Sequence, residues 1–228
     1  MRAAERDVLL MALAAGSGSA DGWSYFGLGH AFVANVTGNT VLLGISVFHG
    51  TGNALHQMIA LAGYVLGTAV GTTLNGNIHP GSVWARPVSR SLFLEGILLL
   101  LAEIAWISAH GHPAPALQAE MLGTTAVAIG IQSGAMMQLK IPGIVTTYIT
   151  GTWTTLVNGL TLLARRQRRI VRNEKSFEER FALQAAVLAS YFLSAVLTGW
   201  AFRYAPRTVG IVPALAVLAV CAYGVLRD

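Results

Sequence analysis

The chain has 228 residues, of which 54% are hydrophobic and 11% are charged, and its formal net charge is +5. Soluble domains carry about 25% charged residues, so this composition excludes an ordinary soluble fold. The net charge does not indicate a nucleic-acid-binding protein, because seven of the fifteen Lys and Arg residues lie between Arg165 and Arg180 and no helix with a basic face adjoins them.

Charged residues are missing from long stretches of the chain. Between Val8 and Ala85, the only charged side chain is that of Asp21. A helix needs about 20 apolar residues to cross a bilayer, so the sequence predicts an all-α integral membrane protein, a polytopic helical bundle that forms a single transmembrane domain over residues 1–228. In chain order, the predicted hydrophobic segments are 8–26, 32–48, 55–74, 91–109, 117–138, 144–163, 181–202 and 208–226.

The basic residues between these segments predict the topology, because cytoplasmic loops are enriched in Lys and Arg. They fall on one side if the first two segments together cross the membrane once and the fifth and sixth segments do the same. We therefore predict six net crossings with two broken or re-entrant elements, and a cytoplasmic N-terminus and 165–180 loop. Arg203 and Arg207 fall on the outer side in this scheme. The residues placed in the cytoplasm are Arg2, Arg6, Arg86, Arg90, the 165–180 cluster and Arg227.

A faint internal repeat supports the same pairing of segments. The string Val-Thr-Gly-Asn at 36–39 is echoed by Ile-Thr-Gly-Thr at 149–152, and Asp21-Gly22 is echoed by Ser133-Gly134. Repeats at about 8–110 and 117–226, each with three net crossings, have opposite orientations, which is the architecture of many secondary transporters. Chance similarity is the alternative. The helix-packing residues Gly63, Gly67 and Gly71 would correspond to Ser190, Ser194 and Thr198.

Small polar residues interrupt both short hydrophobic segments. In lipid, an interrupted helix is stable only if protein or trapped water satisfies its backbone groups. We expect these residues to line a solvated ion or substrate pathway; the alternative is that they only hydrogen-bond neighbouring helices. The candidates are Asn35, Thr37, Gly38, Asn39, Thr150, Gly151 and Thr152.

Asp21 is a further candidate for the pathway, because an ionisable side chain at membrane depth usually faces the protein interior or a watery route. We expect its partner to be His30, Asn35 or the pair Gln132 and Ser133. The alternative is that Asp21 caps a helix that starts at the next residue.

Glu95 and Glu103 lie eight residues apart, about 12 Å along one predicted helix, and could form two stations of an ion path. Glu95 could instead pair with Arg90 at the membrane surface. The sequence has a single cysteine, Cys221, and no nucleotide, zinc-protease or hydrolase motif. We therefore expect no metal, no cofactor and no enzymatic activity.

Two strings give the chain a resemblance to a known family. Residues 20–25 read ADGWSY and residues 32–39 read FVANVTGN. Together with Glu95-Gly96, Gln132 and the string TTYITGT at 146–152, they resemble the YoaK-like family of bacterial membrane proteins, a domain of unknown function (DUF 1275). Gly22 stands where the family usually has alanine, and the family's basic stretch is reduced to Lys140. The resemblance implies a multi-pass protein of the bacterial cytoplasmic (inner) membrane and supplies no substrate.

The broken segments, the membrane acids and the repeat favour a small secondary transporter or permeation protein for an unidentified ion or small solute. A non-transporting scaffold or accessory subunit is the alternative. An intramembrane enzyme would need a denser cluster of catalytic groups. The predicted partners are the lipid bilayer, the solute and possibly a second copy of the chain.

Overall fold

The computed structural model describes residues 1–49, 53–76, 84–139, 147, 149–164 and 174–227. These residues confirm the predicted all-α fold class and contain eight α-helices and a short 3-10 turn, η1 (Pro206–Thr208). The helices are α1 (Ala3–Gly27), α2 (Val36–His49), α3 (Ala54–Asn75), α4 (Arg86–Ser108), α5 (Pro115–Gln138), α6 (Ile149–Ala164), α7 (Glu174–Tyr204) and α8 (Ile211–Arg227). Each predicted segment corresponds to one helix. The helix of the second segment, however, begins at Val36, four residues later than predicted. Residues 144–146 and 148 of the sixth predicted segment lie outside the described residues.

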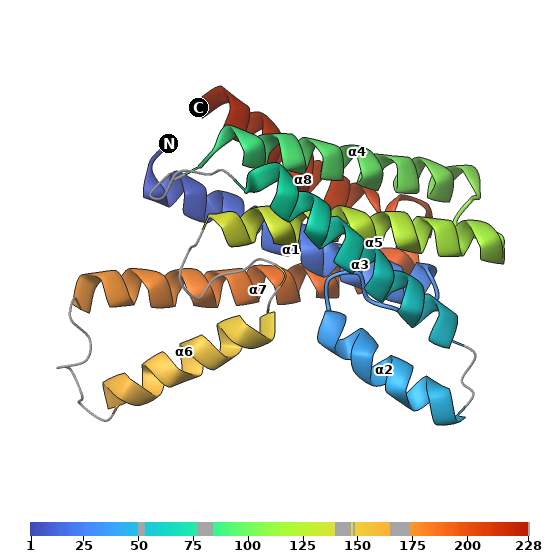
Figure 1. Cartoon of the computed structure of the whole chain (residues 1–228), viewed down its shortest axis with the longest axis horizontal. Coiled ribbons are helices and arrows are strands. Elements are labelled where there is room, and N and C mark those ends of the chain that lie inside the picture. Colours follow the sequence, from blue (N-terminus) through green and yellow to red (C-terminus); the bar gives the residue numbers. More distant parts are fainter. Residues whose placement is uncertain (50–52, 77–83, 140–146, 148, 165–173, 228) are drawn as a thin grey trace.

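The six long helices run side by side, whereas α2 and α6 are short and slope away from them (Figure 1). These two short helices begin near each other at the middle of the molecule and end toward opposite ends. Both termini of the chain and the starts of α4 and α7 lie at one end of the bundle (Figure 1). The basic residues that were predicted to be cytoplasmic come from both halves of the sequence, and these parts of the chain lie together at that end.

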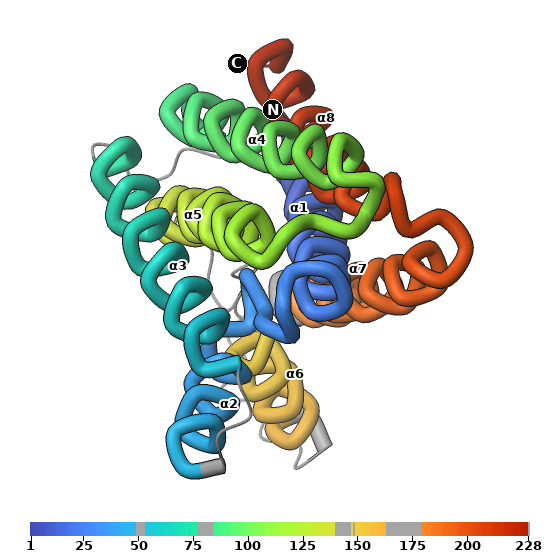
Figure 2. Tube along the Cα trace, turned by 90° about the vertical axis from the view of Figure 1, so that its right-hand side faces the viewer, coloured from blue at the N-terminus to red at the C-terminus, as the bar shows by residue number. Residues whose placement is uncertain are grey.

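Viewed along the bundle, the helices are arranged in layers (Figure 2). The helices α1 and α5 lie at the centre, with α7 outside α1 and α3 outside α5. One side of this layer is covered by α4 and α8, and α2 and α6 lie on the other. The central position of α1 and α5 explains their composition: a helix surrounded by protein needs small and polar residues for packing more than a lipid-facing apolar surface.

Within the described residues, four helical stretches are long and apolar enough to cross a membrane: Ala54–Asn75, Arg86–Ser108, Glu179–Tyr204 and Pro206–Arg227. They correspond to α3, α4, α7 and the η1–α8 unit, which are the outer long helices. Their exposed faces carry large apolar side chains such as Val65, Leu101 and Leu197. An exposed apolar surface of this kind is stable in contact with lipid chains.

Glycines allow the central and outer helices to approach closely. A Cβ atom built on Gly67 would collide with the backbone carbonyl of Val127, and one on Gly71 would collide with that of Ile131. A Cβ atom built on Gly63 would lie 2.9 Å from the carbonyl oxygen of Gly123, which is also on α5. The backbones of α3 and α5 are therefore in direct contact, as expected for small residues repeated every four positions.

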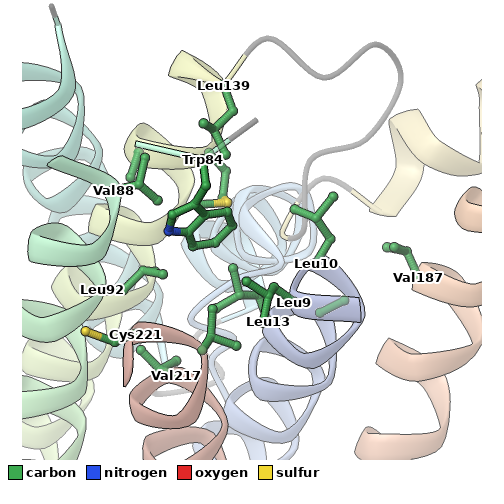
Figure 3. Close-up of a cluster of buried hydrophobic side chains, with 14 of the residues drawn as sticks. Leu9, Leu10, Leu13, Trp84, Val88, Leu92, Leu139, Val187, Val217 and Cys221 are labelled. Carbon is green, nitrogen blue, oxygen red and sulfur yellow. The ribbon is translucent and has the colours of Figure 1, made fainter. Parts of the chain in front are cut away.

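A buried apolar cluster joins α1, α4 and α8 near the end of the bundle that holds the termini. Leu10 and Leu13 of α1 meet Leu92 of α4 and Val217 of α8, and Trp84 covers the group (Figure 3). The indole nitrogen of Trp84 donates a hydrogen bond to the Ser89 hydroxyl at 3.0 Å. This cluster fixes α4 and α8 against the central layer.

Candidate functional site

Asp21 lies on α1 and holds the segment that leads into α2. Its Oδ1 atom accepts hydrogen bonds from the backbone N–H groups of Val33 at 2.8 Å, Ala34 at 2.6 Å and Asn35 at 3.4 Å. Its Oδ2 atom accepts a hydrogen bond from the Tyr191 hydroxyl of α7. A buried carboxylate with several donors is a stable arrangement in an apolar surrounding. Asp21 thus ties together α1, the α1–α2 connector and α7.

This arrangement corrects the alternative given above for Asp21. No helix starts at Gly22, because α1 runs without interruption from Ala3 to Gly27. Asp21 does satisfy backbone N–H groups, but those of a segment twelve to fourteen residues further along the chain. Of the expected partners, Asn35 contributes through its backbone.

Asn35, the last residue of the connector, and Asn39, in the first turn of α2, stabilise the start of this helix. The Asn35 side-chain oxygen accepts a hydrogen bond from the Gly38 N–H at 3.0 Å, which is the geometry of an N-cap. Asn39 is buried and bonds the backbone of Phe32 in both directions: Oδ1 accepts from the Phe32 N–H at 2.8 Å, and Nδ2 donates to its carbonyl. The absence of a side chain at Gly38 leaves room for the Asn35 amide and the Phe32 ring.

Asn39→Ala should lower the stability of the protein, because it leaves both backbone groups of Phe32 without their partner. We expect a loss of about 1–3 kcal/mol, measured as a lower midpoint in thermal unfolding of the detergent-solubilised protein. The unfolding midpoint of Asn39→Asp should fall between those of the wild type and Asn39→Ala, since a carboxylate accepts from the N–H but cannot donate to the carbonyl. Asn158→Ala, at an exposed position of α6, is the control. Equal midpoints for Asn39→Ala and this control would contradict the role assigned to Asn39.

The second half of the chain has a related contact at the corresponding place. Ser133 of α5, which the sequence aligned with Asp21, shares a hydrogen bond of 2.6 Å with the hydroxyl of Thr147. Thr147 lies two residues before the start of α6, as Ala34 lies two residues before the start of α2. A polar group on each central helix therefore contacts a residue that lies two positions before a short helix.

A pocket of about 320 Å³ lies where α2 and α6 begin. This volume is within the range of small-molecule sites. Thr37 and Thr150, both exposed, contribute from the first turns of the two short helices, and Tyr64 and Tyr191 contribute from α3 and α7. The described residues that line the pocket are Ala34, Asn35, Val36, Thr37, Tyr64, Thr147, Ile149, Thr150 and Tyr191.

The two tyrosines were missed by the sequence analysis, although a signal for them was present. Gly63 was aligned with Ser190, and the residues that follow these two positions are Tyr64 and Tyr191. Extending the alignment by one position finds the pair. An aromatic residue in an apolar segment looks like ordinary packing material until its hydroxyl partner, here Asp21 for Tyr191, is known.

The remaining pathway candidates lie outside the described lining of the pocket. Gln132 donates from Nε2 to the Ser17 hydroxyl at 3.0 Å and so links α5 to α1. Gly151 accepts a hydrogen bond at its carbonyl from Thr155 at 2.8 Å, within α6, and Thr152 is buried. The Gln132 contact joins two helices, whereas the Gly151 contact is internal to α6.

Glu95 and Glu103 are both buried on α4, and neither lines the pocket. The Glu95 carboxylate has no hydrogen-bond partner among the described residues. The surface pairing of Glu95 with Arg90 is therefore wrong: Glu95 has no exposed area, whereas Arg90 is exposed. The Glu103 carboxylate and the ring of Trp23 both lie beside Gly210, so that a Cβ atom built on Gly210 would collide with these two side chains.

Residues 9–224 match the family described as "Protein of unknown function (DUF1275)". The chain belongs to this family. A relative in Bacillus subtilis (strain 168), the "UPF0700 transmembrane protein YoaK", is 30% identical over 202 residues, which cover 87% of this chain and 85% of the relative. No solved structure matches the chain. The resemblance carried by the ADGWSY and FVANVTGN strings is thus confirmed, and this DUF1275 protein is a membrane protein with apolar spanning helices.

Proposed function

We propose that this DUF1275 protein is a small secondary transporter or permeation protein whose solute binds in the pocket where α2 and α6 begin. The observation that carries the proposal is the composition of the pocket wall. Thr37 with Thr150 and Tyr64 with Tyr191 come from corresponding positions of the two halves. A site formed by short helices from two related halves is typical of transporters built from repeats.

The packing of the long helices supports an inverted repeat of α1–α4 and α5–α8. A Cβ atom on Gly18 of α1 would collide with the carbonyl of Tyr191, and a Cβ atom on Gly130 of α5 would collide with that of Tyr64. Gly22 and Gly134 also face these helices, since a Cβ atom would collide with the Thr198 side chain of α7 and with the Thr68 carbonyl of α3, respectively. Each central helix thus packs on the third helix of the other half. A repeat of this kind would place the pocket near an approximate two-fold axis.

The distribution of basic residues supports a cytoplasmic position for the end of the bundle that holds both termini. The predicted cytoplasmic residues of the N-terminus, the start of α4 and the C-terminus all belong to this end (Figure 1). Cytoplasmic loops are enriched in Lys and Arg. We propose the inner membrane as the location, with the pocket reached from either side as the short helices move.

The chemistry of the lining favours a solute with hydrogen-bond acceptors, and small anions in particular. No Asp, Glu, Lys or Arg is among the described residues that line the pocket. Asp21 is close by, but its carboxylate is directed at backbone N–H groups and at Tyr191. The first turns of α2 and α6 meet the pocket, and the N-terminal ends of helices favour negative charge.

Flux into proteoliposomes tests the proposal, with a panel of small anions, small cations and neutral metabolites. For a transported solute, Thr37→Val and Thr150→Val should each lower the flux about fivefold, since each removes one hydrogen bond to the solute. Thr161→Val is a matched control, because this threonine is exposed at the far part of α6 and bonds only its own helix.

Unchanged flux in both pocket variants would show that the solute does not use this pocket. A wild-type protein that moves no solute in the panel but co-purifies with one partner would favour the alternative, a scaffold or accessory subunit. The glycine-mediated contact between α3 and α5 is compatible with either role.

A further inference from the structure

A second pocket, of about 400 Å³, lies between the start of α4 and the end of α8. It is distant in sequence from the short helices and shares no lining residue with the pocket between α2 and α6. Arg86, Arg90 and Phe93 form its wall on α4, at a spacing that places them on one helix face. Cys221 and Val225 form the wall on α8, and Ser89 lies at the base.

The pocket changes character along the helix axis. Arg86 is the first residue of α4, Arg90 lies one turn further, and Phe93 is about 10 Å deeper than Arg86. On the opposite wall, the exposed Val225 is near the end of α8, and Cys221 lies one turn deeper. Charged groups therefore occupy the rim, and apolar groups occupy the part that extends toward the middle of the bundle.

Among the described residues, no acidic side chain neutralises the positive charge at the rim. Both arginines are exposed, and within the described part of the chain neither of them makes an ion pair. The first turn of α4 holds no acidic residue and no side-chain cap. The two guanidinium groups provide several N–H donors for a phosphate group.

We propose that this pocket between α4 and α8 binds an anionic phospholipid. The phosphate would lie between the guanidinium groups of Arg86 and Arg90, and one acyl chain would follow Phe93, Val225 and Cys221 toward the bundle centre. The occupant is assigned from charge complementarity at the rim and from the apolar wall, which a free anion would leave uncovered. Basic pockets between membrane helices are known to bind anionic headgroups.

The test is lipid binding to the full-length protein, purified in a mild detergent and titrated with phosphatidylglycerol or phosphatidylcholine, with retained lipid counted by native mass spectrometry. The wild type should retain phosphatidylglycerol in preference. Arg86→Gln with Arg90→Gln should reduce its affinity about tenfold and remove the preference. Arg86→Lys with Arg90→Lys should retain part of it, because charge remains while the paired N–H geometry is lost.

Arg203→Gln with Arg207→Gln is the matched control, because it removes two exposed arginines from the opposite end of the bundle. Equal affinity of the wild type for the two lipids, or an equal loss in the control, would overturn the proposal. Release of the lipid by millimolar inorganic phosphate would overturn it as well, since it would indicate a site for a free anion. Thermal unfolding of each variant establishes that it is folded before it is scored.

Discussion

Gly67→Ala is expected to destabilise the protein by about 3 kcal/mol or to prevent the helices from packing, although the change adds only one methyl group. The added Cβ atom would overlap the carbonyl oxygen of Val127, which is part of the α5 backbone and cannot rotate away. Overpacking of a rigid contact costs about 1–3 kcal/mol and sometimes more. The midpoint of thermal unfolding, measured in detergent together with size-exclusion chromatography, records the loss.

Gly44→Ala provides the comparison for this prediction. Gly44 is also a helix-interior glycine, on α2, but a Cβ atom there has no heavy atom within 4 Å. Replacing it should raise the stability by about 0.5–1 kcal/mol, because alanine favours the helix without meeting a neighbour. Opposite shifts at Gly67 and Gly44 would separate close helix contact from helix propensity. A Gly67→Ala protein as stable as the wild type would mean that α3 and α5 do not touch through their backbones.

Asp21→Ala is expected to be comparably damaging, with a loss of about 3 kcal/mol or more. Alanine leaves three backbone N–H groups of the α1–α2 connector and the Tyr191 hydroxyl without an acceptor in a buried setting. Each unsatisfied buried group costs about 1–3 kcal/mol, and part of this is regained if the connector moves. The loss appears as a lower unfolding midpoint and as faster proteolysis of the connector.

Asp21→Asn distinguishes the shape of the side chain from its charge. The amide oxygen can still accept from the connector, so this variant should keep most of the stability that Asp21→Ala loses. Glu120→Ala, which removes an exposed acid from α5, should change stability by no more than about 0.5 kcal/mol. If Asp21→Ala behaved like Glu120→Ala, the connector would not depend on Asp21.

The positions of the spanning helices followed from hydropathy, because the outer faces of α3, α4, α7 and α8 are apolar where they meet lipid. The start of α2 did not. Residues 32–35 read as apolar helix, whereas they form a connector whose backbone groups are bonded by Asp21 and Asn39. Hydropathy reports the solvent around a segment, but not the partner of its backbone.

The place where the two short helices begin was predictable, whereas the roles of the individual residues there were not. The TGN and TGT strings located the two helix starts, and the structure brings Thr37 and Thr150 to one pocket. Their sequence gave no way to tell a lining residue from a capping one. Asn35 does both, while Asn39 faces inward to Phe32. That difference depends on the direction in which the chain leaves α1, which is set by contacts with a helix far away in the sequence.

The mutual packing of the halves has a consequence for biosynthesis. Asp21 and Tyr191 are 170 residues apart, and the carboxylate on the first helix acquires its hydroxyl partner only after most of the polypeptide has been translated. Until then the face of α1 that carries Asp21 lacks its contact with α7. The N-terminal half therefore completes its packing only after α7 has been synthesised, so that the last step of folding is the association of the two halves.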